Sequence, residues 1–257
     1  MAKQLPLEQF QPVAIQPPSK NPILFRIRRF FDLQLDTVCS VLQPALGQLS
    51  GTVLDVGAGQ SPWREWLPVH ARYVGIDVEN ADEFGMSRAG SDVIYYDGNT
   101  IPFADAHFDA AFCSEVLEHV PVPEALIAEL ARVLKDSATL LLTVPWSARR
   151  HHIPHDYHRF TPERLHALLD QAGFTEIVIE ERGNDVCVIA NKLLVLTVRL
   201  LRPARKKTLL WSWVPGLLCG VLTAGFMLAA HASLALGAGG KEDPLGYFVK
   251  ARRAKRP

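Results

Sequence analysis

Between Thr52 and Val144 the sequence contains five short apolar runs separated by turns and helical segments, and this alternation restricts the possible folds strongly. The runs are Thr52–Val56, Tyr73–Asp77, Asp92–Tyr96, Phe108–Cys113 and Ala138–Val144. Continuous apolar runs of this length are typical of strands that are buried on both faces of a parallel sheet. Because helical segments alternate with them, we expect βαβ units and a doubly wound, mostly parallel α/β sheet.

Helix and strand signals continue beyond these runs. The segment Pro123–Lys135 places its apolar residues on one helical face. A second helix is expected to begin after Thr161, a favourable N-cap, and to end near Gly173. Two later strands, Thr175–Glu181 and Gly246–Ala251, are expected to pair as a C-terminal antiparallel β-hairpin.

The N-terminal part of the chain has a different pattern. Residues 1–20 contain four prolines and no continuous apolar segment, which indicates a flexible lead rather than a signal peptide, so we expect a cytoplasmic location. In Asn21–Leu46, apolar residues recur at intervals of three and four, which predicts one or two amphipathic helices. These helices either cover an edge of the core or use Arg26, Arg28 and Arg29 to contact a membrane surface.

The overall composition excludes several classes of protein. The chain has 257 residues, 27 Lys+Arg against 27 Asp+Glu, and 48% hydrophobic residues. This apolar content excludes a disordered chain, and the balanced charge argues against a nucleic-acid binder, which needs surplus cations. Four cysteines without C-x-x-C spacing argue against a disulfide scaffold or a cysteine zinc site, so we expect a reducing compartment.

The first apolar run leads into a glycine-rich turn, Val53–Pro62. Gly57 and Gly59 allow a sharp turn and let a ligand approach the backbone closely. Ser61 and Pro62 suit the N-cap and first position of a following helix, whose free N–H groups would favour a carboxylate or another anion.

Carboxylates stand at corresponding places on the next two strands. Asp77 ends the second strand, 22 residues beyond Asp55, where an acid accepts hydrogen bonds from the ribose hydroxyls of a nucleoside. Asp97 follows the third strand. NAD-binding enzymes also have a glycine turn followed by an acid, but their motif is G-x-G-x-x-G. The residue three beyond Gly59 is Pro62, which argues against an NAD enzyme.

Together these residues resemble the class I S-adenosylmethionine-dependent methyltransferases, in particular the type 11 group, over about Gly51 to Gly173. The resemblance implies a Rossmann-like fold and S-adenosyl-L-methionine as cofactor. Asp55-x-Gly57-x-Gly59 matches the family's first motif, and the segment Phe112–Val120 resembles the wall of its methyl-transfer site. The cofactor-binding residues that it implies are Asp55, Gly57, Gly59, Asp77, Val78, Asp97, Gly98, Ser114 and Glu115.

The sequence departs from the family in two places. Ser61 stands where a third glycine is frequent, and Val78–Ser91 contains Gly85 and Gly90 but no clear helical stripe, so the usual helix there is expected to be short or remodelled.

The segment Pro145–Phe160 follows the fifth strand, at the sheet edge where doubly wound folds bind ligands, and contains four histidines, an aspartate and a tyrosine. It is either a solvated polar loop, a metal site or part of the methyl-acceptor site. The spacings His151/His155 and His155/His158 would suit metal ligands only in a helix. Pro154 disfavours a helix here, so no metal is assigned.

The resemblance places a His-Asp-Tyr-x-Arg-Phe run beside the substrate. This implies that His155 and Tyr157 face the acceptor and serve as catalytic residues, while Asp156 and Arg159 order the loop. His119 is a third catalytic candidate, although a histidine beginning a helix also serves as a cap or packing group.

A hydrophobic insertion, residues 183–242, separates the two late strands. Residues 208–240 contain no Asp, Glu, Lys or Arg. As helices, Val186–Arg202 and Leu209–Leu236 would be about 25 Å and about 42 Å long, against a hydrocarbon core of about 30 Å. Because both strands belong to one sheet, the insertion must cross a membrane an even number of times or not at all.

Three roles remain open for the insertion: a helical hairpin dipped into one leaflet through residues 186–237, a protein interface such as a homodimer, or a cap over the acceptor pocket. The basic linker Arg202–Lys207 favours the first, because anionic headgroups attract it.

We therefore predict three regions: a lead at 1–20, a methyltransferase domain formed by 21–182 with 243–257, and the insertion at 183–242. The expected function is methylation of a small-molecule or lipid-linked acceptor at the cytoplasmic face of the membrane. The alternative is a non-catalytic binding protein that retains the methyltransferase fold.

Overall fold

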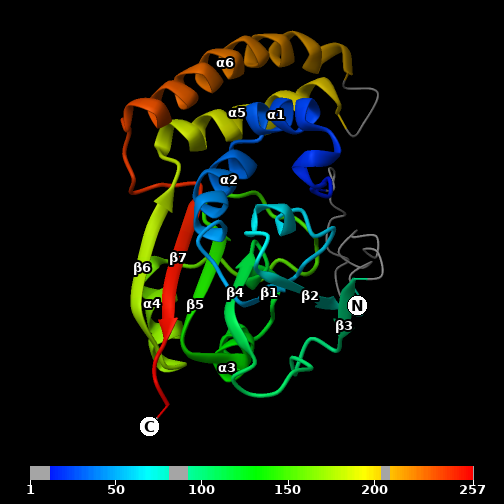
Figure 1. Ribbon diagram of the computed structural model, residues 1–257. Coiled ribbons are helices and arrows are strands. Elements are labelled where there is room, and N and C mark those ends of the chain that lie inside the picture. Colours follow the sequence, from blue (N-terminus) through cyan, green and yellow to red (C-terminus); the bar gives the residue numbers. More distant parts are fainter. Residues whose placement is uncertain (1–11, 81–91, 204–208, 257) are drawn as a thin grey trace, which may run out of the picture.

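The computed structural model describes residues 12–80, 92–203 and 209–256, and within them seven strands form one sheet (Figure 1). The strands are β1 (Thr52–Val56), β2 (Arg72–Val78), β3 (Val93–Tyr96), β4 (Phe108–Ser114), β5 (Leu134–Pro145), β6 (Phe174–Arg182) and β7 (Gly246–Arg253). The helices are α1 (Pro22–Phe31), α2 (Leu33–Leu46), α3 (Pro123–Val133), α4 (Pro162–Gln171), α5 (Asp185–Leu201) and α6 (Leu209–Leu236). Short 3-10 helices are η1 (Pro18–Lys20), η2 (Arg64–Trp66) and η4 (Leu117–His119).

The sheet confirms the predicted fold class. Its order is β3-β2-β1-β4-β5-β7-β6; the first five strands in this order are mutually parallel, and β7 is antiparallel to both of its neighbours. Successive residues of the central strands enter different clusters: Leu54 and Cys113 pack with α3 and α4, whereas Val53 and Phe112 pack with α2. Both faces are therefore covered, which explains why these strands are continuously apolar.

The helices beside the sheet begin and end at recognisable residues. The Thr161 side chain accepts a hydrogen bond from the Arg164 amide at the start of α4, and Gly173 follows its end with a φ of +80°. Residues 21–46 form two helices because the chain breaks at Asp32, whose carboxylate caps α2, while Asn21 caps α1.

The prediction of a helix beginning at Ser61 was wrong. Ser61 has a φ of +51°, its hydroxyl contacts Tyr73 instead of a helix amide, and the chain forms turns followed by the single 3-10 turn η2. Trp63 is buried in the apolar cluster between α2 and the sheet, so this connection packs against the core. In the next connection, residues 81–91, including Gly85 and Gly90, lie outside the described residues.

The insertion between β6 and β7 forms a pair of helices. Thr197 of α5 contacts Thr223 of α6 at 2.8 Å between their hydroxyl oxygens, and Asn184, the N-cap of α5, donates to Ser233 and to the Ala238 carbonyl. The helices are therefore antiparallel. Figure 1 shows α6 crossing one end of the molecule, with α5 and α1 between it and the sheet.

Within the described residues, one helical segment, Trp211–Leu236 of α6, is long and apolar enough to cross a membrane, and only 28% of its most apolar window is buried. Most of the predicted basic linker Arg202–Lys207 lies outside the described part of the chain.

Candidate active site

Two adjoining cavities lie at the carboxyl ends of β1, β2, β4 and β5. The first, here called the Asp77 cavity, has a volume of about 410 Å³, and the second, the Arg149 cavity, has about 340 Å³. They share Gly57, Glu115 and the imidazoles of His119 and His152. Eight of the nine expected cofactor-binding residues line one or both cavities: Gly57, Gly59, Asp77, Val78, Asp97, Gly98, Ser114 and Glu115.

The glycine-rich turn after β1 requires glycine for steric reasons. Gly57 has a φ of +72°, and a Cβ there would lie 2.3 Å from Cγ2 of Val116. The Gly59 amide donates to Oδ2 of Asp77 at 2.9 Å, and the Val78 amide donates to Oδ1 at 2.8 Å. These bonds fix the Asp77 carboxylate at the cavity edge. Burial raises its pKa above the ordinary value, and the two amides partly offset that effect.

Asp55 is the expected cofactor residue that lines neither cavity. It is buried beneath the turn, where the Tyr73 hydroxyl donates to its Oδ2 at 2.7 Å, and Ser61 Oγ lies 2.9 Å from the same hydroxyl. Burial raises the pKa of Asp55 to about 7, against the lowering effect of the Tyr73 hydrogen bond. Asp55 therefore supports the glycine turn from below.

Asp97 occupies an exposed turn after β3. Its Oδ1 accepts hydrogen bonds from the amides of Asn99 at 2.9 Å and Thr100 at 3.2 Å, and these bonds lower its pKa. Gly98 has a φ of +79°, so the turn favours glycine at that position.

Arg182, at the end of β6, is a site residue that sequence reasoning missed. Its side chain is fully buried, and its Nη2 lies 2.7 Å from Oε1 of Glu115. It also donates to the carbonyls of Val144 and Tyr247, at 3.1 and 3.2 Å. Gly246, its partner on β7, leaves room for the guanidinium, because a Cβ there would lie 2.3 Å from the Val144 oxygen and 2.4 Å from Arg182 Nη2.

The loop after β5 is held by an ion pair. Arg159 donates to both carboxylate oxygens of Asp156, at 2.6 and 2.9 Å, and the His151 amide donates to the same carboxylate at 3.0 Å. Although burial opposes it, hydrogen bonds from His151 and Arg159 hold the pKa of Asp156 well below its ordinary value. These contacts keep the loop against the site.

His155 and Tyr157 both line the Asp77 cavity. His155 Nδ1 lies 3.0 Å from the Tyr157 hydroxyl, so the two side chains form a pair that can exchange a proton. Tyr157 is partly exposed, which leaves the pair accessible to an entering molecule.

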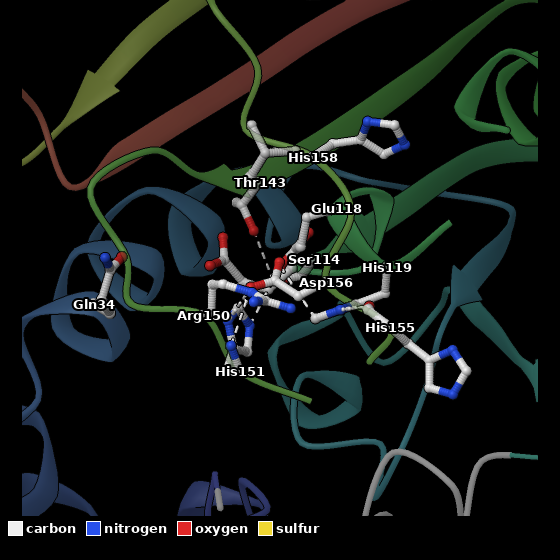
Figure 2. A network of polar contacts seen from close by, with 12 residues as sticks. Gln34, Ser114, Glu118, His119, Thr143, Arg150, His151, His155, Asp156 and His158 are labelled. Atoms are coloured by element: carbon white, nitrogen blue, oxygen red, sulfur yellow. Dashed lines mark hydrogen bonds and ion pairs between the residues drawn. The ribbon is translucent and has the colours of Figure 1, made fainter. Parts of the chain in front are cut away.

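His119 ends η4 and lies where the two cavities meet. Burial, reinforced by His151, lowers its pKa to about 4, so the imidazole is neutral near pH 7. Glu118 beside it is completely buried, and burial together with Glu115 raises its pKa well above the ordinary value. Figure 2 shows Glu118, His119 and His151 within one polar network.

Part of the chain that forms this site matches a known family model. Residues 54–142 match the methyltransferase domain family, Methyltransf_11. An uncharacterized methyltransferase from Mycobacterium sp. (strain JLS) is 32% identical over 95 residues, which cover 36% of this chain and 38% of that protein. The ubiquinone biosynthesis O-methyltransferase of Pectobacterium atrosepticum is 31% identical over 103 residues, which cover 37% of this chain and 43% of the relative.

A solved structure extends the similarity to the whole fold. The SAM-dependent methyltransferase from Archaeoglobus fulgidus aligns over 90% of this chain and 99% of its own, with a TM-score of 0.53 and 16% identity. Residues 54–142 therefore match the type 11 methyltransferase domain, and the chain as a whole has the fold of a class I methyltransferase. The match spans less than half of the curated relatives' lengths.

Proposed function

We propose that the protein transfers a methyl group from S-adenosylmethionine to an apolar small-molecule or lipid-linked acceptor at the cytoplasmic face of a membrane. The observation that carries this proposal is the pair of adjoining cavities. One carries the acids Asp77 and Asp97, the other extends beneath α5, and Gly57 and Glu115 lie between them.

The Asp77 cavity fits the nucleoside part of the cofactor. Asp77 presents fixed carboxylate oxygens for ribose hydroxyls, and the Asp97–Asn99 turn borders the same cavity. Gly57, which lines both cavities, and Gly59, which lines the Arg149 cavity, present backbone rather than side chain toward the expected position of the methionine part. When bound, S-adenosylmethionine supplies a methyl group on a sulfonium, and the protein's task is to align the acceptor with it and exclude water.

The Arg149 cavity suits the acceptor. Its wall includes Leu35 and Val38 of α2 and Val195 of α5, so the insertion contributes directly to the site. An acceptor entering beneath the helices would contact apolar side chains before it reached Gly57. The named activity of the Pectobacterium relative, O-methylation in ubiquinone biosynthesis, supports an oxygen atom on an apolar molecule as acceptor.

His155 and Tyr157 are the proposed catalytic pair. A hydroxyl acceptor must lose its proton as the methyl group arrives, and the pair offers a route for that proton. His119, between the cavities, is proposed to contact the reacting groups.

The outer surface of the insertion supports membrane contact. Val214, Leu218 and Val221 recur at helical spacing on α6 and are 65%, 64% and 74% exposed. Phe30 of α1 stacks on His231 of α6, so α1, which has exposed apolar residues of its own, lies against α6. Since α6 lies across one end of the molecule (Figure 1), we propose that it rests in the plane of the membrane interface.

The activity test combines the full chain, S-adenosylmethionine carrying a labelled methyl group, and cell membranes, with mass spectrometry of the lipid extract. We expect a labelled product that is lost with Asp77→Ala. Cofactor binding without labelling of lipid-soluble or water-soluble extracts would favour the non-catalytic alternative, and labelling confined to water-soluble products would exclude a membrane acceptor.

Membrane contact is tested by flotation with anionic vesicles. The triple substitution Val214→Asp, Leu218→Asp and Val221→Asp should abolish flotation, because it places charges in the proposed lipid-facing surface. Val69→Asp, a change at another fully exposed position, is the matched control and should float like the wild type. A wild-type protein that stays at the bottom, or forms a dimer that the triple variant dissociates, would indicate a protein interface instead.

A further inference from the structure

Three histidines converge at the junction of the two cavities. One ring nitrogen from each of His119, His151 and His152 lies within 4.8 Å of the others. His119 comes from η4 after β4, whereas the other two come from the loop after β5, so two distant segments of the chain build the cluster. All three side chains are partly buried.

Backbone carbonyls orient two of these imidazoles by contacting their Nδ1 atoms. Nδ1 of His119 lies 2.7 Å from the His155 carbonyl oxygen, and Nδ1 of His151 lies 3.1 Å from the Arg149 carbonyl oxygen. A carbonyl only accepts hydrogen bonds, so each Nδ1 carries a proton and Nε2 is the nitrogen of each ring that could bind a metal ion. Backbone carbonyls and carboxylates orient metal-binding histidines in the same way.

The two Nε2 atoms face a buried carboxylate. Oε1 of Glu118 lies 3.6 Å from Nε2 of His119 and 3.9 Å from Nε2 of His151. Among the described residues, neither carboxylate oxygen of Glu118 has a hydrogen-bond partner. The Nε2 atoms of His119 and His151 and a buried oxygen of Glu118 thus face the same space, where a cation would be coordinated by the two imidazoles and stabilised by the ionised carboxylate.

We propose that His119, His151 and His152 bind one divalent transition-metal ion, preferably Zn²⁺, and that Glu118 supplies the neighbouring negative charge. Imidazole nitrogens bind zinc at about 2.0–2.1 Å, so tetrahedral ligands lie about 3.4 Å apart, and binding would draw the three nitrogens closer than the 4.8 Å within which they now lie. Three protein ligands leave a fourth position open.

This fourth position opens toward the cavities, because His119 and His152 line both of them. An oxygen of the methyl acceptor would bind there and would lose its proton more easily beside the metal. This last role rests on the proposed function, whereas the metal site itself stands on the histidine and glutamate geometry.

The test is metal binding by the full chain after treatment with a chelator and dialysis, without S-adenosylmethionine. Calorimetric titration with Zn²⁺ should give one ion per chain, and Co²⁺ should produce the visible absorption of a tetrahedral site. His119→Ala, His151→Ala and His152→Ala should each weaken Zn²⁺ binding by about 100-fold or more, beyond the roughly 10–100-fold typical of losing an outer partner. Glu118→Gln should weaken it about 10-fold.

His166→Ala removes an exposed histidine on α4 and is the matched control, expected to bind Zn²⁺ like the wild type. Circular dichroism checks folding, and Zn²⁺ should raise the Tm of the wild type but not of the three ligand variants. Wild-type protein that takes up no stoichiometric Zn²⁺, or folded ligand variants that retain its affinity, would overturn the proposal. Because cofactor binding is measured separately, loss of S-adenosylhomocysteine binding with intact Zn²⁺ binding would refute only the proposed function.

Discussion

At the scale of single residues, two buried charged side chains, Asp55 and Arg182, hold parts of the candidate site in place. Asp55 lies under the glycine turn with a hydroxyl partner, and Arg182 lies between strands with a carboxylate and carbonyl partners. Each of them holds in place a residue that lines the Asp77 cavity: Asp55 supports the turn at Gly57, and Arg182 pairs with Glu115.

The substitution Asp55→Asn should change the pH dependence of stability. The carboxyl has a pKa of about 7 when folded and an ordinary value of 3.8, so between these values the folded state binds a proton that the unfolded state lacks. The free energy of unfolding of the wild type should therefore fall relative to the variant by up to about 4 kcal/mol as pH rises from about 4 to 7. Urea unfolding of both proteins across this range measures the difference, and parallel curves would show that Asp55 ionises normally.

Removing the buried guanidinium should be costly. Arg182→Met leaves Glu115 without its cation and two carbonyls without their donor, and should lower the free energy of unfolding by about 3–5 kcal/mol. Arg164→Met breaks an exposed ion pair with Glu124 and should cost at most about 1 kcal/mol. Chemical denaturation compares the two. Equal losses would mean that Arg182 makes no more than a surface contribution.

At the scale of elements, Asn184 joins α5 to α6. Its side chain accepts from the Cys187 amide and donates to Ser233 and Ala238, so Asn184→Ala removes a cap and the link to α6 together. We expect a loss of about 2–3 kcal/mol and faster hydrogen exchange in α5 and α6. Asn21→Ala, which removes only the cap of α1, should cost about 1 kcal/mol. If hydrogen exchange also accelerates across the sheet, the helix pair α5–α6 does not open as a separate unit.

The elements also show what can be predicted from the sequence. The central strands were predictable because burial on both faces leaves a continuous apolar run, as at Thr52–Val56. The helix after Ser61 was not, because the burial of Trp63 and the Tyr73 contact outweigh a favourable cap and proline. Local signals specify elements that pack as regular layers, whereas tertiary contacts decide the short connection beneath the site.

The candidate site divides in the same way. Asp77 and Asp97 were predictable, because parallel strands bring their carboxyl ends to one sheet edge. The histidine cluster was not, because sequence spacing compares neighbours within one loop and His119 joins from another segment. The sequence spacings that disfavour a metal site join loop histidines to one another, whereas the fold brings His151 and His152 together with His119.

At the scale of the whole molecule, the balanced net charge is a sum over unlike parts. Asp77 and Asp97 line the Asp77 cavity, whereas the insertion contributes Asn191 and Val195 of α5 to the Arg149 cavity and carries the long apolar helix α6. The return of β7 to the sheet means that α5 and α6 must begin and end at the same side of any membrane. The fold thus places α5, which pairs with the apolar helix α6, against the Arg149 cavity.

The central claim is that the Asp77 cavity holds S-adenosylmethionine. Calorimetric titration of the full chain with S-adenosylhomocysteine and, separately, with NAD tests it directly. We predict one S-adenosylhomocysteine per chain, affinity lowered about 10–100-fold by Asp77→Asn through weaker ribose hydrogen bonds, and no NAD binding. Binding of NAD without binding of S-adenosylhomocysteine would contradict the account.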